Sequence, residues 1–142
     1  MNKIINELLL EKSTTDSKAN TKRSPRLTQN SKLFKTVVNA IKDKKGESII
    51  SLDLRNIDEA VADFFIVCEA QSSTQIHAIA ANIEKEVKDN CDERAYHTSY
   101  GPHWTLIDFV NIVVHVFDRE QRKFYDIEGL WADAKHTEHL DK

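Results

Sequence analysis

The amino-acid sequence predicts a mixed α/β domain, a sheet with flanking helices. A continuous apolar run at Phe64–Cys68 is typical of a strand buried on both faces. A pattern of helical period follows this run, and two further apolar segments of strand length come later in the chain. A strand, a helix and then more strands favour a right-handed crossover that returns the chain to the same sheet.

The first regular element is expected to be a helix that begins after Ser31. Ser31 can cap its start, and Gly46, which follows Lys44 and Lys45, is a standard stop signal. After this helix, residues 48–54 alternate between apolar and polar side chains, which predicts a strand. The apolar side chains of the helix share one face: Leu33, Phe34, Val37, Val38 and Ile41.

A second helix is predicted from about Ser73 to Asn90. Ser72 and Gln75 have the spacing of a capping box, in which the serine accepts from the Gln75 amide and the Gln75 side chain reaches back. Glu84 and Lys88 are spaced to pair on the outer face. The inner face is apolar and consists of Ile76, Ile79, Ala80, Ile83 and Val87.

The second half of the chain is rich in predicted strands. A weak strand is expected at residues 95–98, and stronger ones at 104–109 and 112–117. Since only Val110 and Asn111 separate the last two, they should form a hairpin. Asp118 and Gln121 again have capping-box spacing and predict a short helix that runs toward Tyr125. Residues 135–142 are expected to be a tail.

Length and composition describe one domain with an additional N-terminal segment. The 142 residues are 40% hydrophobic and carry a net charge of −3, which suits a basic protein partner better than nucleic acid. No apolar run is long enough to span a membrane and no secretory cleavage site follows the start, so we expect a cytoplasmic protein. Residues 1–30 are polar and basic with little to bury, and are expected to be disordered.

The chain offers few groups for metal or cofactor chemistry. Cys68 and Cys91 match no zinc or redox spacing, and His136 and His139 lack a third ligand. With three glycines, the chain cannot build a glycine-rich phosphate loop. We therefore expect no metal and no cofactor.

Carboxylates near strand ends leave one enzymatic alternative open. Asp53, Asp58 and Asp63 lie where metal-dependent nucleotide chemistry would place them, but such chemistry needs two carboxylates one residue apart on a strand. No such pair exists in a predicted strand. A magnesium-dependent nucleotide-binding or nucleotidyltransferase-like enzyme is the alternative hypothesis.

The strand at residues 112–117 points to a partner. Its side chains are largely apolar on both faces, yet the sequence predicts two substantial helices, which can cover one face. The other face is left to residues 124–131, to a second subunit or to a different protein. Carboxylates would surround such an interaction surface: Asp108, Asp126, Glu128 and Asp133.

Three segments resemble, in order, the signatures of the ribosomal silencing factor family, also called Iojap-like. The first is Ala62–Val67 followed by Ser72-Ser73, and the second joins Trp104–Phe109 to Ile112–Phe117. The third is Arg122–Ala134. The resemblance predicts a silencing-factor domain at residues 31–134, between the 1–30 extension and the 135–142 tail. One departure is Val110-Asn111, where most relatives have Gly-Asp; valine does not easily adopt the positive φ of such a turn.

This resemblance implies a fold similar to nucleotidyltransferases but without their catalytic residues. It implies a non-enzymatic translational repressor that binds the large ribosomal subunit through ribosomal protein fourteen, blocks joining of the small subunit, and has relatives that act in large-subunit maturation. The basic extension is a candidate for a minor contact with ribosomal RNA, and a homodimer is a candidate state of the free protein. The partner-binding residues are expected to be Trp104, Asp108, His115, Tyr125, Asp126, Glu128, Leu130 and Trp131, with the tryptophans contributing most unless they belong to the core.

Overall fold

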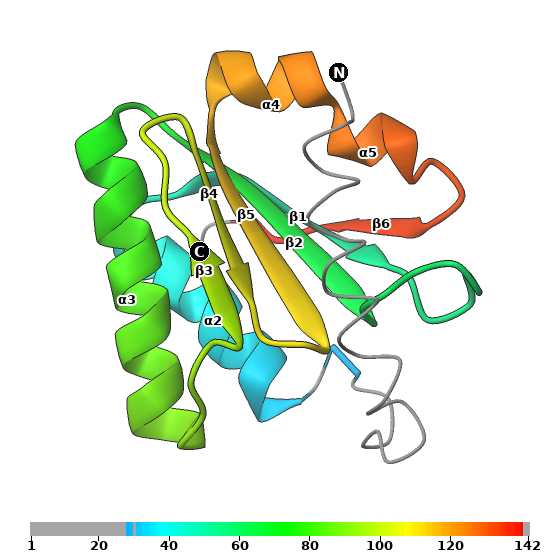
Figure 1. Ribbon diagram of the computed structural model, residues 1–142, viewed down its shortest axis with the longest axis horizontal. Coiled ribbons are helices and arrows are strands. Elements are labelled where there is room, and N and C mark those ends of the chain that lie inside the picture. Colours follow the sequence, from blue (N-terminus) through cyan, green and yellow to red (C-terminus); the bar gives the residue numbers. More distant parts are fainter. Residues whose placement is uncertain (1–27, 30, 141–142) are drawn as a thin grey trace.

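The computed structural model contains one six-stranded mixed sheet with the strand order β3-β4-β5-β2-β1-β6 (Figure 1). The structure describes residues 28–29 and 31–140. The predicted disorder of the N-terminal extension concerns a segment that, apart from Thr28 and Gln29, lies outside these residues. The predicted mixed α/β class is confirmed.

Helix α2 (Lys32–Asp43) precedes the strands at the centre of the sheet. It begins at Ser31, whose hydroxyl accepts a hydrogen bond from the Phe34 amide at 3.1 Å, as the sequence predicts. Strand β1 (Glu47–Asp53) follows and pairs antiparallel with β2 (Phe64–Ala70). Every residue of β2 is buried, so the prediction of a strand covered on both faces is confirmed.

The end of α2 differs in detail from the predicted stop. The Gly46 amide donates to the Ile41 carbonyl at 3.0 Å and the Lys45 amide to the Lys42 carbonyl at 3.0 Å, which is a Schellman motif. The residue in the left-handed conformation is Lys45, with φ of 65°, and not Gly46. Gly46 is required for space, because a Cβ atom there would collide with the Ile41 side chain.

Helix α3 (Ser73–Cys91) matches its predicted range closely. The Ser72 hydroxyl accepts from the Gln75 amide at 3.1 Å, as predicted. The Gln75 side-chain oxygen, however, accepts from the Gln71 amide at 2.8 Å, one residue before the expected donor. Its amide nitrogen donates to the Lys45 carbonyl at 3.0 Å, so one side chain joins the start of α3 to the end of α2.

The predicted ion pair between Glu84 and Lys88 is wrong. Glu84 accepts from the Thr98 hydroxyl at 2.7 Å and the Tyr100 hydroxyl at 2.5 Å, while Lys88 pairs with Asp92 at 2.9 Å. Because the Glu84 carboxylate holds its proton, the pKa of Tyr100 is raised to about 12. Tertiary contacts with the strand-rich half thus replace the pairing expected within an isolated helix.

Three strands after α3 complete one side of the sheet. Strand β5 pairs parallel with β2 and antiparallel with β4, so the chain returns to the same sheet and forms the predicted hairpin. Strand β3 pairs antiparallel with β4 at the edge. Their bounds are β3 (His97–Ser99), β4 (Trp104–Asp108) and β5 (Ile112–Asp118).

The turn of the β4–β5 hairpin places a valine in a strained conformation. Val110 has a φ of 75°, and the Asn111 amide donates to the Phe109 carbonyl at 2.9 Å across it, the hydrogen bond of a γ-turn. The Asp108 carboxylate accepts from the Val110 amide at 2.7 Å and supports this shape. The turn thus keeps the positive φ that glycine would adopt freely, at a cost of about 1–3 kcal/mol.

The C-terminal part is more ordered than expected. Helix α4 (Arg119–Tyr125) is capped by Asp118 as predicted, and the short helix α5 (Ile127–Leu130) follows it. Strand β6 (Lys135–Glu138) then pairs antiparallel with β1 at the sheet edge, so the predicted tail is wrong for these residues. An exposed edge strand has no apolar side to produce an alternating pattern.

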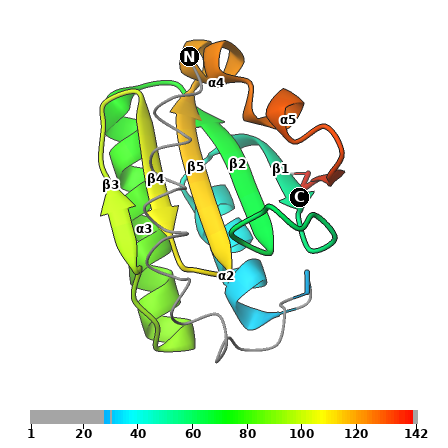
Figure 2. The same cartoon turned by 45° about the vertical axis from the view of Figure 1, so that its right-hand side comes forward.

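The two faces of the sheet are covered differently. Helices α2 and α3 cover one face, here called the helix-covered face, whereas α4 and α5 lie at one end of the sheet (Figure 2). Ile127, Tyr125 and Trp131 pack against side chains of the opposite or second face, among them Phe65 and Phe117. The segment after β5 therefore covers part of this face, as one of the alternatives predicted.

Candidate partner-binding surface

Aromatic side chains gather on the second face. The Trp104 ring lies at the centre, 5.0 Å from Phe117 and 4.9 Å from Tyr125 between centroids. The Phe65 ring lies 4.8 Å from His115 and 5.9 Å from Trp131. This aromatic cluster unites four of the eight predicted partner-binding residues with two buried phenylalanines; its members are Phe65, Trp104, His115, Phe117, Tyr125 and Trp131.

His115 supports this cluster from inside. It is fully buried, and its Nδ1 accepts a hydrogen bond from Trp104 Nε1 at 3.2 Å. Loss of hydration lowers the pKa of His115 to about 3, so the ring is neutral at physiological pH. We therefore reassign His115 from direct partner contact to support of Trp104.

Asp108 is likewise not part of an exposed acidic rim. It is 4% exposed, and its carboxylate accepts from the Val110 amide of the hairpin turn. It lies four positions after Trp104 along β4, a distance of roughly 13 Å. Its role in the structure is to hold the turn, at the end of the strand remote from the aromatic cluster.

The exposed part of the second face lies on the last two helices. We call it the α4–α5 surface and define it as Phe124, Tyr125, Asp126, Leu130 and Trp131. Phe124 is 55% exposed and its ring packs edge-on against half-buried Tyr125 at 5.1 Å. Leu130 is 41% exposed, and Trp131 is half-buried against Phe65. Large apolar side chains exposed on elements that a core holds in place are typical of a protein interface.

Asp126 combines exposure with a structural role. It separates α4 from α5 in a left-handed conformation, with φ of 48°, and its carboxylate accepts from the Gly129 amide at 3.1 Å. A Cβ atom at Gly129 would collide with this carboxylate. Glycine at position 129 therefore lets Asp126 cap α5 while the acid remains on the surface.

Glu128 is engaged within the chain. It is partly exposed, and its Oε2 accepts from Arg122 Nη2 at 2.8 Å. Of the four predicted acids, Asp126 and Asp133 are thus exposed without an ion pair in the contacts described, while Glu128 is paired and Asp108 is buried.

Carboxylates also line a pocket of about 470 Å³ at the end of β1 that is remote from the α4–α5 surface. Their arrangement bears on the alternative hypothesis of a nucleotide-binding enzyme. Asp53 there is held by Arg55 through contacts of 2.7 and 2.9 Å, and this ion pair lowers the pKa of Asp53. Asp63 is 2% exposed. Within residues 28–29 and 31–140, no group of three or more His, Cys, Asp or Glu side chains is arranged to hold a metal ion. Burial raises the pKa of Cys68 to about 12, which keeps it a thiol.

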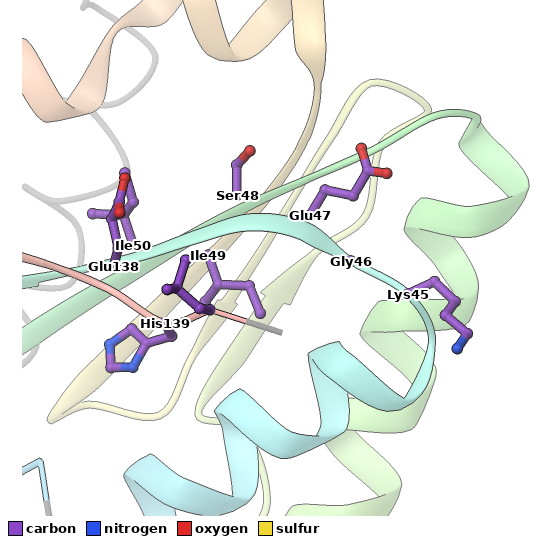
Figure 3. A pocket seen from close by; sticks show the side chains of 9 residues that line it. Lys45, Gly46, Glu47, Ser48, Ile49, Ile50, Glu138 and His139 are labelled. Atoms are coloured by element: carbon purple, nitrogen blue, oxygen red, sulfur yellow. The ribbon is translucent and has the colours of Figure 1, made fainter. Parts of the chain in front are cut away.

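A second pocket, of about 390 Å³, lies at the sheet edge where β6 ends beside β1 (Figure 3). Ile50 and Glu138 point to one side of the strands, and Ile49 and His139 point to the other, toward α2. The His139 ring packs on Phe34 at 5.5 Å between centroids and contacts the Ser51 hydroxyl at 2.9 Å. His139, which lines this pocket, is therefore part of the packing between the sheet and α2.

Sequence reasoning did not single out three residues that shape the α4–α5 surface. Phe124 is the most exposed of its apolar side chains, and Arg122 and Glu69 form a buried ion pair at 3.2 Å between α4 and β2 next to it. A glutamate inside the otherwise apolar β2 was the available signal, because a buried carboxylate requires a cation nearby. No such signal existed for Phe124, whose helix is too short to show a clear period.

The structure is thus a six-stranded α/β sheet with two helices on one face and exposed aromatic and acidic side chains at one end of the other. The chain matches the family described as "Ribosomal silencing factor during starvation" over residues 27–142. The ribosomal silencing factor RsfS of Halalkalibacterium halodurans is 37% identical over 110 residues, which cover 77% of this chain and 93% of that protein. The chain therefore belongs to the ribosomal silencing factor family.

Two further relatives agree with this assignment. The Bacillus subtilis ribosomal silencing factor RsfS is 36% identical over 107 residues, covering 72% of this chain and 86% of that protein. A crystal structure from Chromobacterium violaceum is similar with a TM-score of 0.67 at 28% identity, and covers 76% of this chain and 90% of that chain. In the part of the chain that the structure describes, no helix is both long and apolar enough to cross a membrane.

Proposed function

We propose that this protein represses translation by binding the large ribosomal subunit through ribosomal protein fourteen and excluding the small subunit. The proposal rests on family membership and on the α4–α5 surface, where Phe124, Leu130 and the acidic residue Asp126 are exposed. Ribosomal proteins are commonly basic, and this chain carries a net charge of −3. Exclusion of this kind requires occupancy of one face and no turnover, so it needs no enzymatic activity. Because the two ribosomal subunits join in the cytoplasm, we propose that the protein acts there.

The buried geometry supports a preformed surface. Within the aromatic cluster, the Trp104 and Tyr125 rings pack against each other, and Trp131 packs edge-on against Phe65. Side chains held in place before binding lose little conformational entropy when a partner docks. Aromatic anchors surrounded by polar groups are the residues that carry most of the energy in protein interfaces.

Two truncations test this surface directly. Phe124→Ala and Leu130→Ala remove exposed apolar area without opening a buried cavity, so both variants should melt close to the wild-type temperature. Each should weaken binding to purified ribosomal protein fourteen and to large subunits, by roughly 30-fold for a central residue, equivalent to about 2 kcal/mol. Titration by fluorescence anisotropy and sedimentation with isolated large subunits measure the two affinities.

Tyr96→Ala is a matched control. Tyr96 is 49% exposed beside β3, on a different part of the molecule, and its truncation should leave binding unchanged. Subunit joining followed by light scattering tests the mechanism: saturating wild-type protein should prevent it. Normal joining under saturation, or equal losses in the Tyr96 and Phe124 variants, would contradict the proposal. A second copy of the chain as occupant would instead appear as a dimer in sedimentation.

The basic residues of the N-terminal extension are proposed to add a minor contact with ribosomal RNA. Removing residues 1–26 retains Gln29, whose side chain donates to the Thr137 hydroxyl of β6 at 3.3 Å. The truncated protein should bind large subunits more weakly, with the larger loss at low salt, because phosphate contacts release counterions. A loss independent of salt would argue against an RNA contact.

A role in large-subunit maturation would be tested by profiling precursor particles in a deletion strain.

A further inference from the structure

A charged network lies directly beneath the α4–α5 surface. Glu69 of β2 is 8% exposed; its Oε1 accepts from Arg122 Nη1 at 3.2 Å and its Oε2 from Arg119 Nε at 2.8 Å. Burial of a carboxylate is costly unless cations and hydrogen-bond donors surround it. Two arginines on one turn of α4 supply both, and they attach this helix to the end of β2.

Arg122 extends the network to two further elements. It is 7% exposed, and its Nη1 also donates to the Ser48 carbonyl at 2.8 Å, at the irregularity in β1 where Ser48 has φ of 50°. Its Nη2 donates to Glu128 Oε2 of α5 at 2.8 Å. One planar guanidinium therefore joins β1, β2 and α5, which a lysine ammonium could not reproduce in the same geometry.

Helix α5 depends on such contacts for its position. It has four residues, too few for a helix to be stable alone. Burial of Ile127, the Asp126 cap, the Arg122–Glu128 ion pair and the packing of the C-cap residue Trp131 against Phe65 are among the described contacts that hold it. Leu130 ends this helix and Trp131 follows it, so the placement of both depends on the orientation of α5.

We propose that Arg122 is the positioning residue of the docking surface and acts through Glu128. In this arrangement Glu128 contacts no partner; it transmits the position of Arg122 to α5 and so to Leu130 and Trp131. The inference rests on the proposed function of the α4–α5 surface for its consequence on binding. The positioning itself is measurable in the free protein.

Hydrogen exchange of the full-length protein tests the positioning without any partner. Glu128→Gln removes the charge of the ion pair and leaves the contacts of Arg122 with Glu69 and Ser48 in place. The Leu130 and Trp131 amides, which donate within α5, should then exchange roughly tenfold faster or more, while β2 amides keep their rates. Glu120→Gln, at an exposed acid of α4 outside this network, is the matched control and should change neither set. Unchanged α5 exchange in Glu128→Gln would overturn the proposal.

Salt titration of large-subunit binding separates indirect from direct action. If Glu128 acts through α5, Glu128→Gln should weaken binding by a similar factor, roughly three- to tenfold, at every salt concentration. A direct contact with a basic partner would instead be screened, so the loss would disappear at high salt. That second outcome would contradict the proposal.

A double-mutant cycle completes the test. Arg122→Met and Glu128→Gln should be less damaging together than the product of their separate losses, because they interrupt one connection. Arg122→Lys should restore little of the affinity, since one compact ammonium cannot reach acceptors that two separate guanidinium nitrogens contact on three elements. Independent, multiplicative losses would overturn the proposal. If Arg122→Met fails to fold, the exchange and salt experiments on Glu128→Gln decide alone, and failure of the wild type to bind large subunits would affect only the proposed function.

Discussion

The two faces of the sheet bury different kinds of side chain. Beneath α2 and α3 the buried cluster is largely apolar, with side chains such as Phe64, Ile66 and Val114 facing the helices, and the polar groups buried beside it, such as the Ser51 hydroxyl, are uncharged. The second face buries an imidazole at His115, a carboxylate at Glu69 and a guanidinium at Arg122 beside its aromatic rings. An apolar core suffices for stability, whereas buried polar groups are costly and are kept mainly where they determine one specific arrangement. The helix-covered face thus stabilises the fold, and the second face shapes the surface.

Truncation on the helix-covered face should have the largest effect on stability. Ile79 is fully buried between α3 and the sheet, so Ile79→Ala leaves a cavity and should lower the free energy of unfolding by about 2–5 kcal/mol. Urea denaturation measures this loss. The folded fraction should still bind large subunits with wild-type affinity. If the folded fraction of Ile79→Ala bound large subunits more weakly than the wild type, the two faces would not be independent.

The second face should make stability depend on pH through His115. Its pKa in the folded protein, about 3, lies below the value near 6.5 of an unfolded histidine. Between these values the unfolded chain binds a proton that the folded protein does not, so stability is fully present above pH 6.5 and is lost as the pH falls. The expected slope is about 1.4 kcal/mol per pH unit.

Denaturation of the wild type and of His115→Gln between pH 7 and pH 5 measures this slope. Glutamine stays neutral and can still accept from Trp104, so the variant should lose most of the pH dependence. His139→Gln is the comparison variant on the other face. Burial and nearby Lys42 also lower the pKa of His139, but this histidine is only part-buried next to the helix-covered face. Equal slopes in the wild type and in His115→Gln would show that His115 is accessible to solvent.

The sequence predicted the helix-covered face better than the second face, for a physical reason. Residues such as Ile79 and Val114 repeat with the period of their own helix or strand, so local pattern alone identifies them. The second face is assembled from distant segments, and the role of each residue depends on register and on how the chain after β5 folds back. Sequence pattern therefore predicted Asp108 on a surface although it is buried, and gave no sign of the ion pair between Glu128 and Arg122. Strand β6 was missed because an exposed edge strand shows no apolar alternation.

The smallest expected effect concerns the β4–β5 turn, where the end of the second face carries local strain. Val110 has φ of 75°, a conformation that costs a β-branched residue about 1–3 kcal/mol and glycine almost nothing. Glycine also loses more entropy on folding, by roughly 0.5–1 kcal/mol. Val110→Gly should therefore raise the free energy of unfolding by about 1 kcal/mol, measured as a higher midpoint in urea. Val110→Ala keeps the Cβ atom and should gain less. Because the turn lies at the end of β4 remote from Trp104, neither variant should alter binding to large subunits. A less stable Val110→Gly would mean that Asp108 and the packing of the valine side chain already compensate for the strain, so that this end of the second face would be built for stability like the opposite face.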